Sequence, residues 1–234
     1  MKKFLIISIL IISCSYPKLS SDLLVYENDF ENQLLTNIDG GNISKYNNTN
    51  VLGDFNNDSF ILHLSNLENH EFIFVAFDLY IHGSWDGNFN GFKEEESGFK
   101  DQPDIWGMEL NPDMPYLTNM VFKKFETTFS NSPCFTNYCL KQSYPNNFPF
   151  INNPKTGSSI NFLPEHCNSL DQNNEKTTLY KIEISFAHKD NALILKFYDK
   201  LFQPNAIDKN GNNIAKCDES WSLDNLKIRA VNYD

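Results

Sequence analysis

Oxygen-bearing side chains occur at every second position in one loop of the sequence, at Asp86, Asn88 and Asn90, with glycines at 87 and 91. Carboxylate and amide oxygens are the ligands that Ca²⁺ prefers, and glycine permits the sharp turn that aims them at one point. Asp104, further along the chain, would complete the set. The spacing therefore predicts a calcium site on these four residues. A solvated loop rich in Asn and Gly, without metal, is the alternative.

The predicted calcium site differs from an EF-hand. An EF-hand places a bidentate acid at its twelfth position, which is Ser97 when Asp86 is the first. The acids at 94–96 come too early, and no flanking helix is indicated. The segment 54–58 repeats the alternating oxygens without the glycine, so we interpret it as a plain turn between strands.

Two tryptophans, Trp85 and Trp106, bracket the predicted calcium loop. Aromatic faces stack on sugar rings, so exposed indoles here would form a platform for carbohydrate. Tyr80 and His82, on the same face of a predicted strand as Asp78, are the other candidate ligand contacts. Burial of the two indoles in the core is the alternative.

The spacing of the acidic residues bears on whether the protein is an enzyme or a binding protein. Concanavalin A-like glycosidases place two carboxylates on one strand, where they flank the glycosidic bond. Asp104 and Glu109 lack this spacing, because an odd separation puts them on opposite faces of a strand. Neither a Gly-x-Ser-x-Gly elbow nor a His-Glu-x-x-His pair occurs. No catalytic residue is assigned, and a polysaccharide-acting hydrolase or lyase stays open as an alternative to binding.

The sequence alternates apolar and polar residues, which indicates β-strands. We therefore expect strands to position the candidate site residues. From Glu71 to His82 every odd position after the first is apolar, which is typical of a strand with one face against a core. Lys189-Asp190-Asn191 separates two such runs and is predicted to form a hairpin turn. Similar runs cover 23–30, 59–64, 104–110, 121–129, 179–188, 192–199 and 226–231. Without a sustained helical period, these runs predict an all-β, two-sheet antiparallel β-sandwich.

The segment 219–228, Glu-Ser-Trp-Ser-Leu-Asp-Asn-Leu-Lys-Ile, contains the pattern Trp-x-x-Asp-Asn-aliphatic. This pattern resembles the closing motif of exported jelly-roll domains of the concanavalin A-like and MAM-like type. The resemblance implies a jelly-roll sandwich, concanavalin A-like or galactose-binding-like, and no particular activity. It also implies that Trp221 packs inward and that Asp224 and Asn225 contact backbone or metal where the last strand enters the sheet.

Four cysteines lie beyond the N-terminal region. An even number in an oxidising compartment predicts two disulfides, and four cysteines permit three pairings. We favour Cys134 with Cys139 and Cys167 with Cys217. A zinc site is the alternative, although no Cys-x-x-Cys pair occurs and the nearest histidine, His166, adjoins Cys167.

The N-terminal residues have the order of a secretory signal: basic at 1–3, apolar at 4–12, and small at Ser13 before Cys14. The apolar run is too short to span a bilayer, which takes about 20 residues. Ile11-Ile12-Ser13-Cys14 resembles the bacterial lipobox, which implies cleavage before Cys14 and acylation of its thiol. Two or three acyl chains would hold the protein stably at a membrane. An ordinary secretory signal is the alternative.

The expected organisation is a signal peptide over 1–13, a lipidated tether over 14–21 and one sandwich domain over 22–234. The net charge of −11 argues against nucleic acid, because phosphate binding needs a basic face. We expect a lipid-anchored protein of the bacterial cell envelope, at the outer membrane facing the periplasm or at the cell surface. It would bind a glycan or a protein ligand, with Ca²⁺ in a structural role. A purely structural envelope protein is the alternative.

Overall fold

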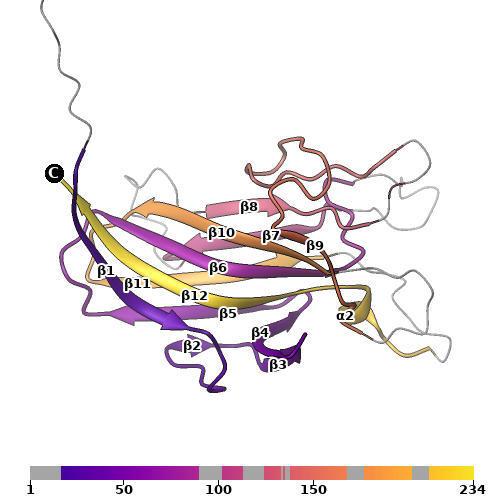
Figure 1. Cartoon of the computed structure of the whole chain (residues 1–234), viewed down its shortest axis with the longest axis horizontal. Helices are drawn as coiled ribbons and strands as arrows, with labels where there is room; N and C mark the ends of the chain where they lie inside the picture. Colours follow the sequence, from indigo (N-terminus) through magenta and orange to yellow (C-terminus); the bar gives the residue numbers. More distant parts are fainter. Residues whose placement is uncertain are drawn as a thin grey trace, which may run out of the picture.

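The computed structural model describes residues 17–89, 102–112, 124–132, 134, 138–167, 177–201 and 211–234 (Figure 1). Within them, the alternating segment forms strand β6 (Phe72–Gly83), and its odd positions from Ile73 to Ile81 are buried. Successive side chains of a strand point to opposite faces. One face of β6 therefore packs on the core, and the other carries Asp78, Tyr80 and His82.

The described strands form two antiparallel sheets that pack face to face. The larger sheet has the order β3 (Ile43–Tyr46), β4 (Thr49–Phe55), β12 (Glu219–Tyr233), β6, β10 (Thr177–Ala187) and β9 (Ile160–Leu163), and β1 (Leu19–Asn28) also pairs with β12. The smaller sheet has the order β2 (Ile38–Asp39), β5 (Ser59–Ser65), β11 (Ala192–Lys200), β7 (Ile105–Leu110) and β8 (Lys124–Thr128). A short helix, α2 (Ala215–Asp218), precedes β12. The prediction of an all-β, two-sheet antiparallel sandwich is confirmed.

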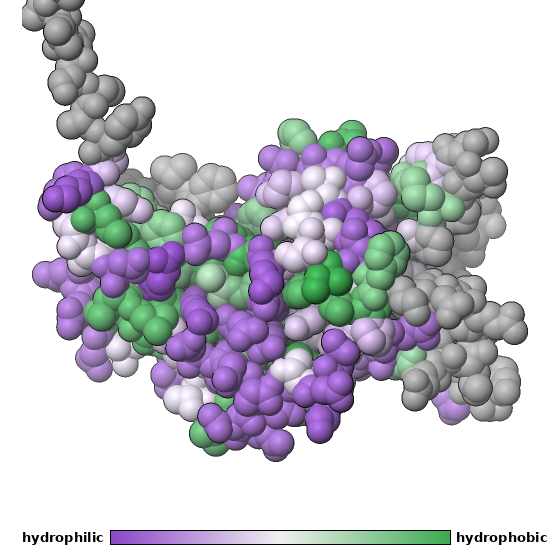
Figure 2. Space-filling view, viewed as in Figure 1, coloured by the Kyte–Doolittle hydropathy of each residue, from purple (hydrophilic) through white to green (hydrophobic). Residues whose placement is uncertain are grey.

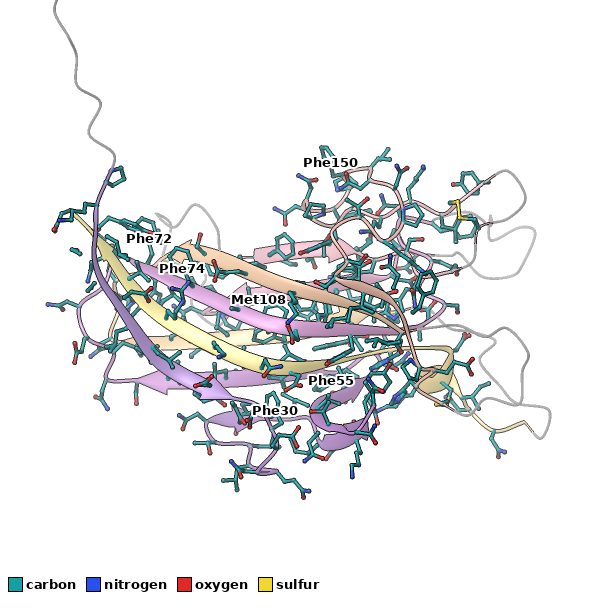
Figure 3. The ribbon with its side chains drawn as sticks, in the orientation of Figure 1. Phe30, Phe55, Phe72, Phe74, Met108 and Phe150 are labelled. Atoms are coloured by element: carbon teal, nitrogen blue, oxygen red, sulfur yellow. A yellow bond between two sulfur atoms is a disulfide. The ribbon has the colours of Figure 1, made fainter. Side chains whose placement is uncertain are left out.

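Large rings fill the core between the sheets. Trp221 stacks on Phe55 with 4.4 Å between ring centroids, and Phe60 stacks on Phe197 at 4.6 Å. Figure 3 labels three members of this core, Phe30, Phe55 and Met108. The buried apolar residues of the described chain lie between Tyr26 and Val231.

Most connections between strands cross from one sheet to the other. The segment Lys189-Asp190-Asn191 joins β10 in the larger sheet to β11 in the smaller one. The predicted hairpin is therefore wrong, because strand pairing here depends on distant partners that the loop does not encode. In the segment 54–58, Asp54 and Phe55 end β4, and the connection to β5 is confined to 56–58. There the amides of Asn57 and Asp58 donate to the Asp199 carboxylate at 2.5 and 3.2 Å.

Residues 138–163, between β8 and β9, form an excursion that we call the crest. The crest rises above the sheets at the top of Figure 1 and ends in β9. The disulfide Cys134–Cys139 lies at its start. Apart from β9, the described part of the crest contains no strand of either sheet, and Gln142 and Asn152 form an isolated strand bridge. Backbone hydrogen bonds, such as the one from the Phe148 amide to the Glu126 carbonyl at 2.8 Å, and side-chain hydrogen bonds together hold the crest in place.

Candidate functional site

Asn88, a predicted calcium ligand, ties the loop after β6 to the crest. Its amide Nδ2 donates to the Phe150 carbonyl at 2.7 Å. Its Oδ1 accepts from the Ser143 hydroxyl at 2.8 Å and from the Thr128 hydroxyl. An oxygen that already accepts two hydroxyl protons is a poor calcium ligand. The structure therefore gives Asn88 a positioning role toward the crest.

Asp86 and Asp104, two further predicted ligands, do lie together. The Asp86 amide donates to the Asp104 carboxylate at 2.5 Å, and the Ser132 hydroxyl donates to Asp86 Oδ1 at 2.6 Å. Burial raises the pKa of Asp104 well above its usual value, only partly offset by that amide hydrogen bond. Glu219 hydrogen-bonds to the same carboxyl, and a hydrogen bond between two carboxyls requires a shared proton.

Calcium binding in this loop stays a prediction. Asn90 and the acids at 94–96 lie outside the described residues. Among the residues that the structure does describe, no three of His, Cys, Asp and Glu are grouped so as to hold a metal ion. Of the predicted ligands that the structure describes, Asp86 and Asn88 are partly exposed and Asp104 is buried.

The predicted aromatic platform is wrong. Trp85 and Trp106 both have an exposed fraction of 0%. The Trp85 indole donates to the Ser220 carbonyl at 3.0 Å, and Trp106 packs edge-on against Trp221 with centroids 6.0 Å apart. Both rings belong to the core between the sheets and cannot stack on a ligand. Trp221 is also fully buried, as the resemblance to jelly-roll domains implied.

Tyr80 and His82 lie on the outer face of the larger sheet, as predicted, but other residues cover them. The His82 ring nitrogens contact the hydroxyls of Thr177 at 2.9 Å and Ser222 at 2.6 Å. The Tyr46 ring packs edge-on against Tyr80, with 5.3 Å between centroids. Burial, followed by the charge of a neighbouring histidine, lowers the pKa of His82 well below its usual value. His82 is therefore a neutral, satisfied core residue, and its predicted ligand contact is wrong.

The neighbouring histidine is His166, which sequence reasoning did not select. Its ring stacks on His82 at 4.4 Å, and its Nε2 lies 2.9 Å from Asp54 Oδ1. Burial acts to raise the pKa of Asp54, but the hydrogen bond and charge of His166 outweigh it, so the pKa is lowered. The disulfide Cys167–Cys217 adjoins this pair and joins it to the segment before β12. Only its adjacency to Cys167 marked His166 in the sequence.

Both predicted disulfides are confirmed, Cys134–Cys139 and Cys167–Cys217, with Cα–Cα distances of 4.3 and 5.4 Å. Because these four thiols are paired, the alternative of a cysteine zinc site is excluded for them. Sequence separations of 5 and 50 residues put one bond at the start of the crest and the other beneath its end.

The open part of the outer face holds a groove, which sequence reasoning also missed. Its floor is Ala76, which pairs with Glu183 on β10 and with Lys227 on β12. Opposed residues of paired strands point to the same face, so a small residue between two long ones leaves a hollow. Two residues further along β6, Asp78 pairs with Lys181 on β10 and with Asp224 on β12. The hollow has a volume of about 450 Å³.

An irregularity in β12 shapes one side of this groove. The register between β12 and β6 shifts between Asp224 and Lys227, and Asn225 has a left-handed φ of 54°. Asn225 tolerates this conformation better than most residues because its short side chain bonds locally. Its Nδ2 donates to Asp78 Oδ2 at 3.1 Å. The Asp-Asn pair noted in the sequence therefore builds a bulge, with an amide at the groove.

Charge and burial shift the proton equilibria beside the groove. Burial raises the pKa of Asp224 to about 6; the Asn225 amide hydrogen bond opposes this rise, and the charge of Asp78 adds to it. Burial, with the charges of the same two acids, raises the pKa of Tyr80 to about 12. The groove thus combines carboxylates, an amide and ammonium groups, a set suited to hydroxyl-rich ligands.

Comparison with known proteins identifies no family for this chain. No family model matches it, and no curated protein matches it. Among solved structures, the K2 cleaved adhesin domain of Lys-gingipain is similar over 79% of this chain and 74% of that chain, with 10% identity and a TM-score of 0.28. This likeness is too distant to support an argument about function. The protein is a disulfide-bonded, two-sheet β-sandwich, and this class follows from its own strand arrangement and not from the comparison.

The predicted lipid attachment at Cys14 lies outside the described residues and stays a prediction. Among the described residues, no helix is long and apolar enough to cross a membrane.

Proposed function

We propose that the protein is a lipid-anchored binding protein of the bacterial cell envelope that holds a glycan in the groove of its larger sheet. The groove itself is the observation that carries the proposal. Its volume of about 450 Å³ lies within the range of ligand sites, about 300–1,000 Å³. Two disulfides and the lipobox-like sequence support an exported location.

The groove chemistry favours a glycan over an apolar ligand. Carboxylates on Asp78 and Glu183 accept hydrogen bonds from sugar hydroxyls, and the Asn225 amide both donates and accepts. Lys181 and Lys227 add positive charge on two sides, which suits a sugar with a carboxylate or sulfate group. An apolar ligand would displace water from these charged groups without forming hydrogen bonds to them and would bind poorly.

A glycan array on the domain beginning at Ser15, followed by calorimetry on the best ligand, tests the proposal. Ala76→Leu fills the floor of the groove and is expected to weaken binding by at least about tenfold. Ala187→Leu is the matched control, because Ala187 is exposed on the same face of β10 but outside the groove. Equal affinity of the two variants, or an array without any bound glycan, would contradict the proposal.

A polysaccharide hydrolase is the second candidate, favoured by one observation. Asp78 and Asp224 oppose each other on paired strands, and the pKa of Asp224 is raised to about 6, as in a general acid. Hydrolysis would be supported if the wild-type domain released reducing ends from the array ligands and if both Asp78→Asn and Asp224→Asn abolished this release. Binding without release would leave a purely binding function.

A further inference from the structure

Exposed apolar side chains are concentrated on the crest. Of the eleven large apolar side chains exposed in the described chain, six lie between residues 138 and 162. Ile151 is 70% exposed and Phe150 52%, and both occupy the outer end of the crest, where Figure 3 labels Phe150. Figure 2 shows hydrophobic side chains gathered at this top end of the molecule. Water-exposed apolar groups held together in this way mark a contact surface.

The crest also differs in charge from the rest of the chain. The whole sequence has 30 acidic residues, yet none occurs from Thr127 to Pro164, where Lys141 and Lys155 are the charged residues. The Lys155 ammonium lies 5.6 Å from the centre of the Phe162 ring. A segment without acids that combines aromatic rings with lysines is complementary to an anionic, apolar partner.

Hydrogen bonds hold the apolar tip outward and prevent it from folding onto the sandwich. Gln142 Oε1 accepts from the Lys155 amide at 2.7 Å, and its Nε2 donates to the Thr156 carbonyl at 3.0 Å. The Phe150 carbonyl accepts from the Asn88 amide at 2.7 Å. A tip fixed in this way loses little conformational entropy when it binds.

The position of the N-terminus indicates which anionic, apolar partner would lie close to the crest. Pro17, the first described residue, follows Cys14 by three residues, which span at most about 11 Å. A lipid on Cys14 would therefore hold the start of β1 close to a bilayer. In Figure 1 the start of β1 and the outer end of the crest both lie at the upper side of the molecule. A domain tethered so closely can bring the crest to the same bilayer.

We propose that the crest is a second membrane contact. Phe148, Phe150 and Ile151 enter the interfacial layer of the bilayer, and Lys141 and Lys155 lie at the lipid phosphates. This inference rests in part on the lipid anchor proposed above, but the crest should bind vesicles without it. Two contacts would fix the orientation of the sandwich on the membrane, which a single flexible tether does not.

The first test uses the domain beginning at Ser15, which lacks Cys14 and therefore its acyl chains. Its three natural tryptophans are fully buried, so a tryptophan placed at the tip by Phe150→Trp reports its own environment. With vesicles of phosphatidylethanolamine and phosphatidylglycerol, we expect its emission to shift to the blue and brominated lipid to quench it. Leu34→Trp is the control, since Leu34 is also exposed but lies in the loop between β1 and β2. Equal responses from the two tryptophans, or none from Phe150→Trp, would overturn the proposal.

The second test measures sedimentation with the same vesicles. Phe150→Ser with Ile151→Ser is expected to weaken binding at least about tenfold, while Leu34→Ser leaves it unchanged. Lys141→Gln with Lys155→Gln should weaken binding several-fold and reduce its dependence on salt. The membrane contact would be refuted if the wild-type domain did not sediment with vesicles and the serine variant instead lost binding to a glycan or a protein. Failure of Cys14 acylation in the full chain would refute only the anchor.

Discussion

The sandwich and the crest are stabilised by different interactions. In the sandwich, stacked and tilted rings such as Trp221, Phe55 and Phe60 exclude water from a core shared by both sheets. In the crest, the side chains of Gln142 and Asn152 replace the missing sheet and bond to its backbone carbonyls and amides. Hydrophobic burial is non-directional and spread over many residues, whereas each amide hydrogen bond depends on one geometry. The crest can therefore lose its order while the sandwich remains folded.

The largest effect is expected from a ring in the sandwich. Trp221→Ala removes a fully buried indole that stacks on Phe55, and it leaves Asp199 without the indole donor at 2.8 Å. The free energy of unfolding should fall by about 4 kcal/mol or more, measured by urea denaturation. Phe162→Ala, in the crest, is the control, because that ring is 79% exposed and its loss should change stability by less than about 0.5 kcal/mol. Similar losses in both variants would show that the crest contributes to the core.

An intermediate and local effect is expected from Gln142→Ala. The buried Gln142 side chain makes five hydrogen bonds, to Ser130, Tyr144, Lys155, Thr156 and Tyr180. Their loss leaves buried backbone groups unsatisfied, which costs about 1–3 kcal/mol. Hydrogen exchange should show amides of residues 143–156 losing protection while those of β6 keep it.

Lys141→Ala is the control for this variant, because its ammonium bonds to Asn153 at an exposed position. It should leave exchange in the crest nearly unchanged. If Gln142→Ala exposes β6 and the crest together, the two regions unfold as one unit, and the comparison fails.

The smallest effect, a stabilising one, is expected on the outer face of the sheet. Burial raises the pKa of Asp224 to about 6, above its unfolded value. Its contribution to stability is complete below the unfolded pKa and is lost as pH rises through 6. Asp224→Asn keeps the oxygen that accepts from the Asn225 amide and removes the charge. Thermal melts should show the variant more stable by about 1–2 kcal/mol at pH 8 and equal to the wild type at pH 4. A constant difference across this range would contradict the raised pKa.

Much of the fold could be predicted from local pattern. The alternation from Ile73 to Ile81 identified β6 and its buried face. The even number of cysteines indicated two disulfides but left three pairings open, of which the favoured one is confirmed. The candidate site was harder to predict. Trp85 and Trp106 adjoin a polar loop in sequence, but whether an indole is exposed depends on the strands that pack against it. Asn88 has the residue type and spacing of a calcium ligand, yet its oxygen is engaged by Ser143 and Thr128, which come from distant parts of the chain.

The sequence by itself predicted the sandwich class, eight of the strands and the inward face of β6, because hydrophobic period is a local property; β2, β3, β4 and β9 were not predicted. Only the tertiary structure decided which side chains meet outside the core. The groove exists because Ala76 lies between Glu183 and Lys227 on two strands far apart in sequence. The crest projects because Asn88 and Gln142 fix its backbone. Cross-strand register and long-range hydrogen bonds set both features, and neither leaves a period in the sequence.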